Sequence, residues 1–462
     1  MLGGTAQPSV KGARVVVVGA GIGGLTAAFR LRQAGCDVMV LERCAPERVG
    51  GRMAGVRRCG WDIDLGAPLL ARRYHRMLTL AREAGLAGEI LDAADVMGVV
   101  RDGRVHRGRT GTPGRLLSGC LTRHLPVRDR ARLTRDLLRF GPAIHPANMS
   151  RMAAYDDESL TRYVQRRRLA PPTLDTFLDP LNCTLTLAEP EDSAAAGAFV
   201  FLSFLLFGQG LFTFRSGSGA LPRALARSVA VTHHAEVTSV ESTPSGVTIT
   251  WTLPGRPERT TETDAVVLAV PTDRLPHLYP QLPSDLKELF GRTAYARLIQ
   301  TAFCLPGSTG ERSVLLAAPR TESPHVTSFV LQHNLHPQRL CADRGLATAY
   351  LRGRASAQLW DADDTKITGV VLAAADRLGV LPELARDTRA VYIDRLAPCV
   401  VTRSPGEYRA IAAATPRTFV DTRIQLAGGE LYGHSTTIGS LTSGEHAAQG
   451  VLSALRASTR TA

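Results

Sequence analysis

Apolar positions near the start of the chain follow two different periods. Residues 15–18 form an apolar, β-branched run of strand length, and residues 38–41 form a second one. Between these runs, small or apolar residues recur at helical spacing, namely Ala27, Ala28, Leu31 and Ala34. Gly35 then stands where a helix C-terminal cap is expected. The pattern predicts a buried strand, a helix and a second buried strand, in that order.

The turn between the first strand and the helix carries glycines in G-x-G-x-x-G spacing. Gly19 lets the chain reverse tightly, Gly21 lets a phosphate approach the backbone, and Gly24 lets the helix pack closely on the strand. The helix N-terminus, with unpaired N–H groups and a positive dipole end, suits a pyrophosphate. Glu42 ends the second strand at the distance expected of an acid that accepts hydrogen bonds from an adenosine ribose. An acid there favours a ribose with a free 2′-hydroxyl, as in NAD and FAD.

A second glycine turn follows, flanked by arginines, and consists of Arg48, Gly50, Gly51 and Arg52. It suits a second approach to the same pyrophosphate. With the Asp-Leu-Gly-Ala sequence at residues 64–67, this region resembles the flavin-dependent amine oxidoreductase superfamily. That superfamily includes amine oxidases, protoporphyrinogen oxidase and phytoene-type desaturases. The resemblance implies FAD as the cofactor.

The resemblance also implies an α/β fold. A Rossmann-type FAD-binding domain of the GR2-like kind would be interleaved with an α+β substrate domain. We expect the FAD-binding domain to comprise residues 12–75, 228–275 and 396–457. The substrate domain would comprise residues 76–227, mostly helical, and residues 276–395, a sheet with helices.

Further segments match the family's cofactor contacts. By the resemblance, residues 66–69 lie against the isoalloxazine ring and the backbone of Val237 touches the adenine. In the closing segment, Glu430 accepts from a ribityl hydroxyl, and a helix starting near Thr437 and Ile438 stabilises negative charge on reduced flavin. The complete set of expected cofactor-binding residues is Gly19, Gly21, Ile22, Gly23, Gly24, Glu42, Arg43, Gly50, Gly51, Arg52, Gly66, Ala67, Pro68, Leu69, Val237, Gly429, Glu430, Thr437 and Ile438.

Two stretches raise the question of membrane contact. Residues 193–214 carry no charge over a length that can span a bilayer, but a Gly-Gln-Gly sequence at 208–210 interrupts them. We expect a buried helix and strand lining an apolar cavity. Residues 127–140 predict an amphipathic helix with five arginines, which could touch anionic lipid. Because its apolar side lacks the bulky aromatics of an interfacial helix, a solvated face is favoured.

The rest of the chain alternates between strand and helix patterns. Residues 264–271 predict a buried strand. Strand-like runs at 296–305, 326–331 and 347–353 predict a sheet, and a helix is expected at about 363–378. We interpret this sheet as the floor of the substrate site.

Composition narrows the range of partners. The chain has 462 residues, of which 44% are hydrophobic and 21% charged, as in a soluble protein with two domains. A net charge of +13 suggests nucleic acid, but the basic residues are nearly all arginines, spread widely without aromatic platforms, so no nucleic-acid partner is expected. Eight scattered cysteines without C-x-x-C or metal-type spacing favour reduced thiols, a cytoplasmic location and no metal site. Residues 1–14 predict a short disordered arm rather than a signal peptide.

Amine oxidases of the superfamily resemble one another in a lysine near the flavin, just before the strand that matches residues 296–305. This chain has Arg297 or Leu298 there, and its nearest lysine is Lys287. In the closing segment it has Thr436 and Thr437 where an aromatic is expected, although Tyr432 and His434 are close. These departures disfavour amine oxidation without excluding it.

No acid or base stands out for the reaction. His325, His333 and His336 are candidates, but lone histidines of this kind are more often structural or exposed. Flavin can take a hydride from carbon, so the chain has only to hold a C–H bond close to it and exclude water. We therefore assign no catalytic residue.

Three functions remain open. The first is an FAD-dependent oxidase or desaturase that removes hydride from a bulky hydrophobic small molecule and passes the electrons to O2 or another acceptor. The second is a flavin amine oxidase. The third is a flavin-binding protein with a structural or membrane-associated role and no turnover. The sequence leaves the oligomeric state open.

Overall fold

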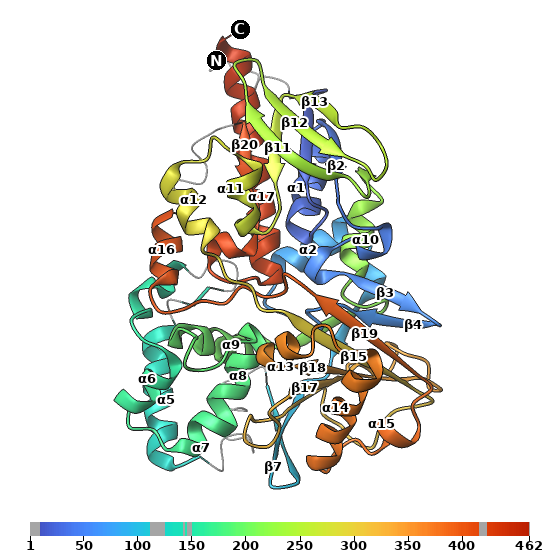
Figure 1. The fold of residues 1–462 in the computed structure, drawn as a ribbon, viewed down its shortest axis with the longest axis vertical. Helices are drawn as coiled ribbons and strands as arrows, with labels where there is room; N and C mark the ends of the chain where they lie inside the picture. Colours follow the sequence, from blue (N-terminus) through green and yellow to red (C-terminus); the bar gives the residue numbers. More distant parts are fainter. Residues whose placement is uncertain (1–9, 111–124, 142–143, 146–149, 415–422, 462) are drawn as a thin grey trace, which may run out of the picture. The chain divides into compact units, whose positions relative to one another are not determined.

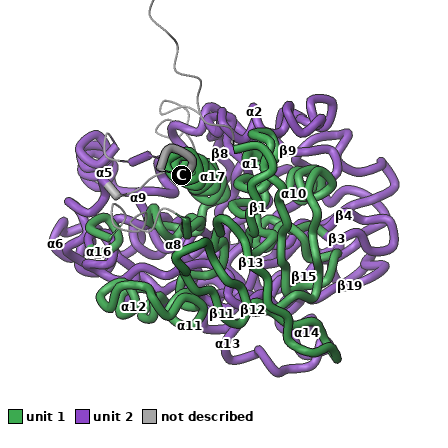
Figure 2. The backbone as a smooth tube through the Cα atoms, turned by 90° about the horizontal axis from the view of Figure 1, so that it is seen from above, with its two compact units in different colours: residues 1–55, 219–293, 410–462 green, residues 56–218, 294–409 purple. Residues whose placement is uncertain are grey.

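A computed structural model describes residues 10–110, 125–141, 144–145, 150–414 and 423–461 of the chain. The expected N-terminal arm up to residue 9 and Cys120 lie outside the described residues. The chain divides into two compact units, each built from separate stretches of sequence (Figure 2). Unit 1 comprises Met1–Gly55, Gly219–Thr293 and Ala410–Ala462. Unit 2 comprises Val56–Ser218 and Ala294–Arg409.

A parallel five-stranded sheet forms the centre of unit 1. Its strand order is β10-β2-β1-β14-β20, with bounds Ala230–Thr232, Asp37–Leu41, Arg14–Val18, Ala265–Leu268 and Ile424–Leu426. Val16 pairs with Met39 on one side and Val266 on the other, so strands far apart in sequence lie side by side. The central strands are buried on both faces, which explains their continuous apolar sequence.

Helix α1 (Ile22–Gln33) lies directly after β1, as the apolar periodicity predicted. It ends in a Schellman motif. Gly35 adopts φ +94°, its N–H donates to the carbonyl of Arg32 (2.9 Å), and the N–H of Cys36 donates to the carbonyl of Leu31 (3.1 Å). The prediction of a glycine cap is confirmed.

A second, antiparallel sheet of unit 1 contains β11 (Glu236–Ser242), β12 (Val247–Thr252) and β13 (Arg259–Thr263). Its apolar face shares one core cluster with the five-stranded sheet, in which Val18, Val240 and Leu268 are buried. The remaining helices of unit 1 are α10 (Ala220–Ala226), α11 (Leu275–Leu278), α12 (Ser284–Gly291) and α17 (Thr437–Thr461), with short turns η1 (Pro46–Arg48), η2 (Gly51–Met53), η7 (Thr272–Arg274) and η10 (Gly429–Tyr432). Helix α16 (Glu407–Ala414) contains the boundary between the units.

A seven-stranded sheet organises unit 2. Its order is β19-β15-β18-β17-β16-β7-β8, with bounds Ala390–Leu396, Leu298–Leu305, Gly345–Leu351, Val326–Leu331, Leu315–Ala317, Val96–Arg101 and Arg104–Arg109. The predicted strands β15, β17 and β18 are confirmed. The sequence did not reveal β7 and β8, which come from the region expected to be mostly helical. Strand β7 pairs with β16, and β8 pairs with β7 at the edge of the sheet.

Helices cover both faces of this sheet (Figure 1). On one face, Ile299 and Phe303 of β15 join a cluster with α13 (Gly353–Gln358), α14 (Asp364–Arg377) and α15 (Glu383–Arg386). On the other face, Leu298 joins a cluster with the helical segment 125–207. The helices of that segment are α5 (Val127–Phe140), α6 (Leu160–Arg166), α7 (Pro171–Thr173), α8 (Asp179–Thr186) and α9 (Ala195–Phe207), with η5 (Ser150–Tyr155) and a π-helical turn (Leu174–Leu178).

Short elements complete unit 2. These are β3 (Gly55–Arg58), β4 (Trp61–Asp64), β5 (Leu70–Ala71), α2 (His75–Glu83), η3 (Ala87–Glu89), β6 (Ile90–Ala93), β9 (Leu211–Phe214) and η8 (Gln332–Asn334). The uncharged run 193–214 folds into α9 and β9, which confirms the predicted helix and strand. Among the described residues, no helix is both long and apolar enough to cross a membrane.

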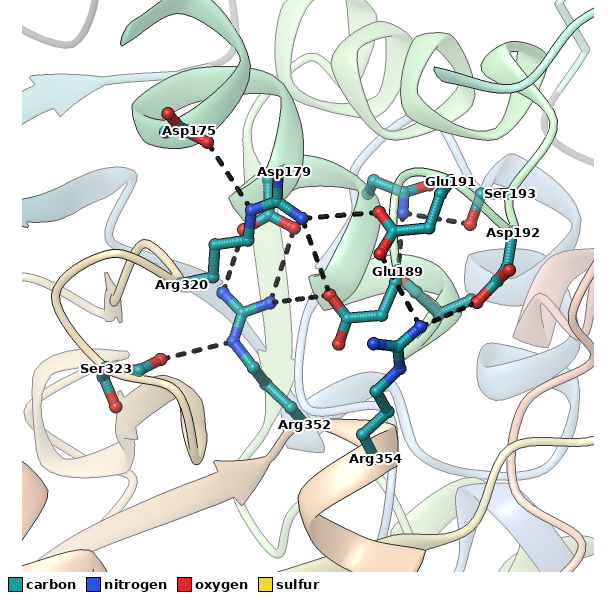
Figure 3. A network of polar contacts seen from close by, with 12 residues as sticks. Asp175, Asp179, Glu189, Glu191, Asp192, Ser193, Arg320, Ser323, Arg352 and Arg354 are labelled. Atoms are coloured by element: carbon teal, nitrogen blue, oxygen red, sulfur yellow. Dashed lines mark hydrogen bonds and ion pairs between the residues drawn. The ribbon is translucent and has the colours of Figure 1, made fainter. Parts of the chain in front are cut away.

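A buried ion pair connects α8 to the sheet of unit 2 (Figure 3). The guanidinium of Arg352, at the end of β18, donates to the carboxylate of Asp179 at the start of α8 (2.9 Å), and both side chains are at most 2% exposed. Arg320 links the outer carboxylates Asp175 and Glu191 at 3.5 and 3.4 Å. Because each buried charge has an opposite partner, this network holds the helix in a fixed place.

Candidate functional site

The first glycine turn of unit 1 is shaped by steric contacts. A Cβ atom at Gly24 would lie 2.1 Å from the carbonyl oxygen of Gly19, and one at Gly19 would lie 2.5 Å from that of Ala269. A Cβ atom at Gly21 would have no heavy atom within 4 Å. The N-terminus of α1 beside it has no side-chain cap and no acid in its first turn. The open side of Gly21 therefore fits an approaching phosphate group.

The second glycine turn lies directly against the first. The N–H of Gly50 donates to the carbonyl of Ala20 (2.9 Å), and Gly21 and Gly50 form an isolated parallel bridge. Gly50 and Gly51 adopt φ +104° and +59°, which explains the glycines. A Cβ atom at Gly51 would come within 3.4 Å of the Gly21 Cα atom. The structure thus brings the two predicted glycine turns together.

Glu42 connects the end of β2 to the first turn. Its carboxylate accepts from the N–H of Ala20 (2.6 Å) and from the N–H of Cys44 (2.8 Å). Its backbone carbonyl accepts from the N–H of Ala235 (2.9 Å), two residues before Val237 on β11. Each carboxylate oxygen has a second lone pair, so a ribose hydroxyl could still donate to it. The predicted acid, the turn and the segment leading to Val237 are therefore adjacent.

The closing segment joins the same part of unit 1 through Arg52. This arginine follows the second glycine turn and forms an ion pair with the fully buried carboxylate of Glu430 (2.5 Å). It also donates to the hydroxyl of Ser435 (2.9 Å). Motifs from near both ends of the chain therefore meet in unit 1.

Helix α17 begins at Thr437, as predicted, and is capped by the hydroxyl of Thr436, which accepts from the N–H of Gly439 (3.1 Å). It packs against α1 at a glycine contact, because a Cβ atom at Gly444 would lie 2.1 Å from the carbonyl oxygen of Gly23. The expected cofactor residues that unit 1 contains are Gly19, Gly21, Ile22, Gly23, Gly24, Glu42, Arg43, Gly50, Gly51, Arg52, Val237, Gly429, Glu430, Thr437 and Ile438. Residues 66–69 belong to unit 2.

In unit 2, buried polar groups hold the chain just before residues 66–69. The carboxylate of Asp64 accepts from the N–H and the hydroxyl of Ser218 at 2.7 and 3.0 Å. Its second oxygen pairs with the guanidinium of Arg339 at 3.3 Å, and the Arg339 side chain is fully buried. The same guanidinium donates to Gln332 on η8 (2.8 Å).

Two side chains from the sheet hold the next residues. The amide of Gln300 on β15 donates to the carbonyl of Asp64 (2.7 Å) and accepts from the N–H of Gly66 (3.3 Å). The hydroxyl of Tyr350 on β18 lies 3.4 Å from the carbonyl of Gly66, and burial raises the pKa of this tyrosine, which keeps it protonated. Sequence reasoning missed these residues. A lone glutamine within the apolar run LIQTAF was the one signal available.

The two candidates for the lysine position have different environments. Leu298 is buried in the apolar cluster of unit 2 that contains α9. Arg297 is exposed, with its guanidinium 5.0 Å from the ring centre of Trp360. Lys287 lies on α12 of unit 1. Neither Arg297 nor Leu298 therefore supplies a lysine amine at the start of β15.

The candidate histidines differ in burial. His333 is buried, its Nδ1 accepts from the N–H of Leu346 (3.2 Å), and its Nε2 lies 3.1 Å from the hydroxyl of Thr309. Burial lowers the pKa of His333 to about 4. His325 is exposed, and His336 is half-buried and accepts from the N–H of Gln338. The contacts of His333 are those of a structural histidine.

Leu69 packs on an apolar cluster of unit 2 that also includes residues of α9. Leu69 is half-buried and packs on the same cluster as Phe201, Phe204 and Phe207 of α9. These phenylalanines recur every three residues and are half-buried, whereas Phe199 is fully buried. The rings of Phe201 and Phe204 are stacked with centres 5.6 Å apart. Half-buried aromatic side chains of α9 therefore pack on the margin of the cluster that also holds Leu69.

Comparison with known proteins supplies independent findings. A family model described as flavin containing amine oxidoreductase matches residues 22–452. A possible lysine-specific histone demethylase 1 of Drosophila melanogaster is 41% identical over 80 residues, which are 17% of this chain and 9% of that protein. An L-amino-acid oxidase of Demansia vestigiata is 47% identical over 75 residues, which are 16% of this chain and 14% of that protein. These matches therefore span only a small part of either relative.

Solved structures match over nearly the whole chain. Cyclohexylamine oxidase from Brevibacterium oxydans has a TM-score of 0.75 at 18% identity, covering 97% of this chain and 100% of its own. A putrescine oxidase variant has a TM-score of 0.74 at 17% identity, covering 96% and 99%. A putative protoporphyrinogen oxidase from Exiguobacterium has a TM-score of 0.72 at 16% identity, covering 95% and 98%. The likeness establishes the fold and confirms the predicted fold class.

Proposed function

The chain belongs to the flavin-containing amine oxidoreductase family, and we propose that within it the protein oxidises a bulky hydrophobic small molecule at a C–H bond. Membership confirms the resemblance found in the sequence. It also confirms FAD as the cofactor and an FAD-dependent oxidoreductase as the class of enzyme. The substrate and the bond that is broken are the proposed part.

The residues that would hold FAD follow from the geometry of unit 1. The open face of Gly21 and the N-terminus of α1 would hold the pyrophosphate, with Gly51 beside them. Glu42 would accept from the adenosine ribose, and Glu430, which is paired with Arg52, would accept from the ribityl chain. When bound, FAD supplies hydride acceptance from a C–H bond.

The observation that carries the proposal is the set of half-buried apolar side chains on the cluster that includes Leu69. Half-buried Leu69, Phe201 and Phe204 offer a substrate apolar and aromatic contacts. Leu298, one of the two candidates for the position where the family's amine oxidases have a lysine, is aliphatic. These apolar side chains favour a hydrophobic molecule and would keep water away from a reacting C–H bond.

Gln300 and Tyr350 would act as positioning residues. They fix both backbone groups of Gly66 from rigid strands, so residues 66–69 have a defined place in unit 2. Neither side chain carries a charge, because the tyrosine stays protonated. We propose that they orient the segment facing the ring and take no proton from the substrate.

A second candidate function is amine oxidation. It is favoured by the structural likeness to cyclohexylamine oxidase and putrescine oxidase, whose names specify amines. Leu298 counts against it. In either case the electrons pass to O2 or to another acceptor.

The test is anaerobic reduction of the purified yellow protein. We expect loss of the flavin absorbance with hydrophobic substrates such as cyclic polyenes or porphyrinogens, and no ammonia. Bleaching by amines with release of ammonia would establish the second candidate instead. If dithionite bleaches the protein but no substrate does, the protein binds flavin without catalysing a reaction. The Glu42→Ala variant should lower FAD occupancy, and unchanged occupancy would contradict the assigned ribose contact.

A further inference from the structure

Helix α5 of unit 2 separates its charges between two sides. Asp129 is fully buried and accepts from the N–H of Ala170 (2.7 Å). Asp136 is also buried and accepts from the hydroxyl of Tyr163 (2.7 Å) and from the guanidinium of Arg167 (2.6 and 2.8 Å). Both acidic side chains of α5 therefore accept hydrogen bonds from other residues inside unit 2.

Three of the five arginines of α5 face outward. The side chains of Arg128 and Arg135 are 67% and 74% exposed, and Arg139 is exposed as well. Arg128 and Arg135 lie 3.6 and 3.9 Å from the carboxylates of Asp129 and Asp136, which also accept hydrogen bonds from inside the unit. The outer side of the helix therefore carries positive charge that its own acids offset only weakly.

Apolar side chains share this outer side. Val127 and Leu138 are 72% and 71% exposed, and they are the exposed large hydrophobic residues found in the described part of the chain. They stand 11 positions apart, close to three helical turns, so they lie on one face with exposed Ala131 between them. A pair of exposed aliphatic residues on the face that also carries the arginines is not explained by the fold.

We propose that this face of α5, formed by Val127, Arg128, Ala131, Arg135, Leu138 and Arg139, binds the surface of an anionic lipid bilayer. The helix would lie in the plane of the interface. Its aliphatic side chains would enter the boundary between headgroups and acyl chains, and its guanidinium groups would pair with lipid phosphates. The net charge of +13 would add long-range attraction to such a surface.

Charge and shape together favour a bilayer over other partners. A nucleic acid would be bound by the arginines but would leave Val127 and Leu138 in water, since this face offers no aromatic platform for bases. An acidic protein would use both features only with a matching apolar patch, whereas lipid supplies apolar and anionic groups everywhere. From the sequence alone, a solvated face was favoured for this helix because its apolar side lacks bulky aromatic residues. The exposure of two aliphatic residues on the arginine side changes that balance.

The experiment is flotation of the full-length holoprotein with vesicles of phosphatidylcholine alone or mixed with phosphatidylglycerol. We expect binding to the anionic vesicles at least about tenfold tighter than to the neutral ones, weakening as salt rises. The variant R128Q/R135Q/R139Q should lose at least about tenfold in this affinity. The variant V127S/L138S should also lose affinity, although its charge is unchanged.

A matched control separates the α5 face from general charge. Arg292, Arg354 and Arg386 are 74%, 63% and 68% exposed on other elements, so R292Q/R354Q/R386Q removes the same charge elsewhere. It should bind vesicles within about twofold of the unchanged protein, because charges beyond a Debye length are screened. Flavin absorbance and the unfolding midpoint verify that each variant is folded.

The proposal fails on any of three results. The first is no binding to anionic vesicles. The second is an equal loss in the control and in the α5 arginine variant. The third is binding that V127S/L138S leaves unchanged, which would mean that the face attracts any polyanion, RNA included.

Discussion

Unit 1 and unit 2 hold their candidate functional segments by different means. In unit 1 the cofactor segments are shaped largely by backbone contacts, since Gly24 packs on the carbonyl of Gly19 and Gly50 bonds to Ala20. In unit 2 residues 62–66 are held by side chains that stand more than 200 positions away in sequence, namely Gln300, which bonds to Gly66, and Arg339, which bonds to Asp62 and Asp64. A backbone-built site depends on glycine spacing, whereas a side-chain-built site depends on paired charges and amides. The two therefore respond to different substitutions.

The largest effect is expected from a buried charge of unit 2. Replacing Arg352 with methionine leaves the carboxylate of Asp179 buried without its cation. Breaking such a pair costs about 3–5 kcal/mol, so the free energy of unfolding should fall by that amount. Urea denaturation followed by circular dichroism measures it.

Arg354 provides the matched control in the same network (Figure 3). Its side chain is 63% exposed and lies 3.4 Å from Asp192, so Arg354→Met should cost less than about 1 kcal/mol. Removing both charges in R352M/D179L should restore much of the lost stability, because no uncompensated charge remains. If the single variant Arg352→Met proved as stable as the unchanged protein, side chains would not be what fastens α8 in unit 2.

This contrast explains which functional residues could be predicted from the sequence and which could not. The glycine turns and Glu42 could be predicted because backbone geometry restricts residue type at fixed spacing, and Glu430 was predicted from the family resemblance. Gln300 and Arg339 were missed because a buried amide or guanidinium bonds to whatever the fold brings near, and no local spacing records it. The strand β7 was missed for a related reason, since it is stabilised by pairing with β16, more than 200 residues away.

The next effect concerns the pH dependence of unit 2. Burial lowers the folded-state pKa of His333 to about 4, against smaller opposing influences from the hydrogen bond with the Leu346 backbone and from Glu383. Between pH 6.5 and about 4 the unfolded chain binds a proton that the folded chain does not, so stability should fall as the pH drops through this interval. The loss is about 3 kcal/mol, since each pKa unit corresponds to 1.36 kcal/mol. Denaturation at a series of pH values measures it.

The His333→Asn variant isolates this contribution, because the asparagine oxygen can still accept from the N–H of Leu346 but cannot take up a proton. The difference in stability between the unchanged protein and the variant should diminish from pH 7 to pH 4. His336→Asn, at a half-buried position, serves as the control and should leave the pH profile as it was. A profile that His333→Asn does not alter would place the titration elsewhere.

A moderate effect is expected at a packed glycine of unit 1. Gly24→Ala puts a Cβ atom 2.1 Å from the carbonyl oxygen of Gly19, which must move together with α1. Overpacking of this kind costs about 1–3 kcal/mol. The apoprotein should therefore melt at a lower temperature even without FAD, as differential scanning calorimetry can measure. An unchanged melting temperature would mean that the turn is less closely packed than its contacts indicate.

The smallest effect on stability is expected three positions earlier and gives the sharpest test of unit 1. Gly21 has φ −71°, which alanine tolerates, and a Cβ atom there would meet no protein atom within 4 Å. Gly21→Ala should therefore change the unfolding free energy of the apoprotein by less than about 0.5 kcal/mol. FAD affinity should nevertheless fall at least about tenfold, a loss of about 1.4 kcal/mol, because the added methyl group occupies the space proposed for the pyrophosphate. Titration of the apoprotein with FAD, followed by flavin fluorescence, measures this loss. Equal affinity in the variant and the unchanged protein would mean that the phosphate does not approach Gly21, even if the protein is yellow.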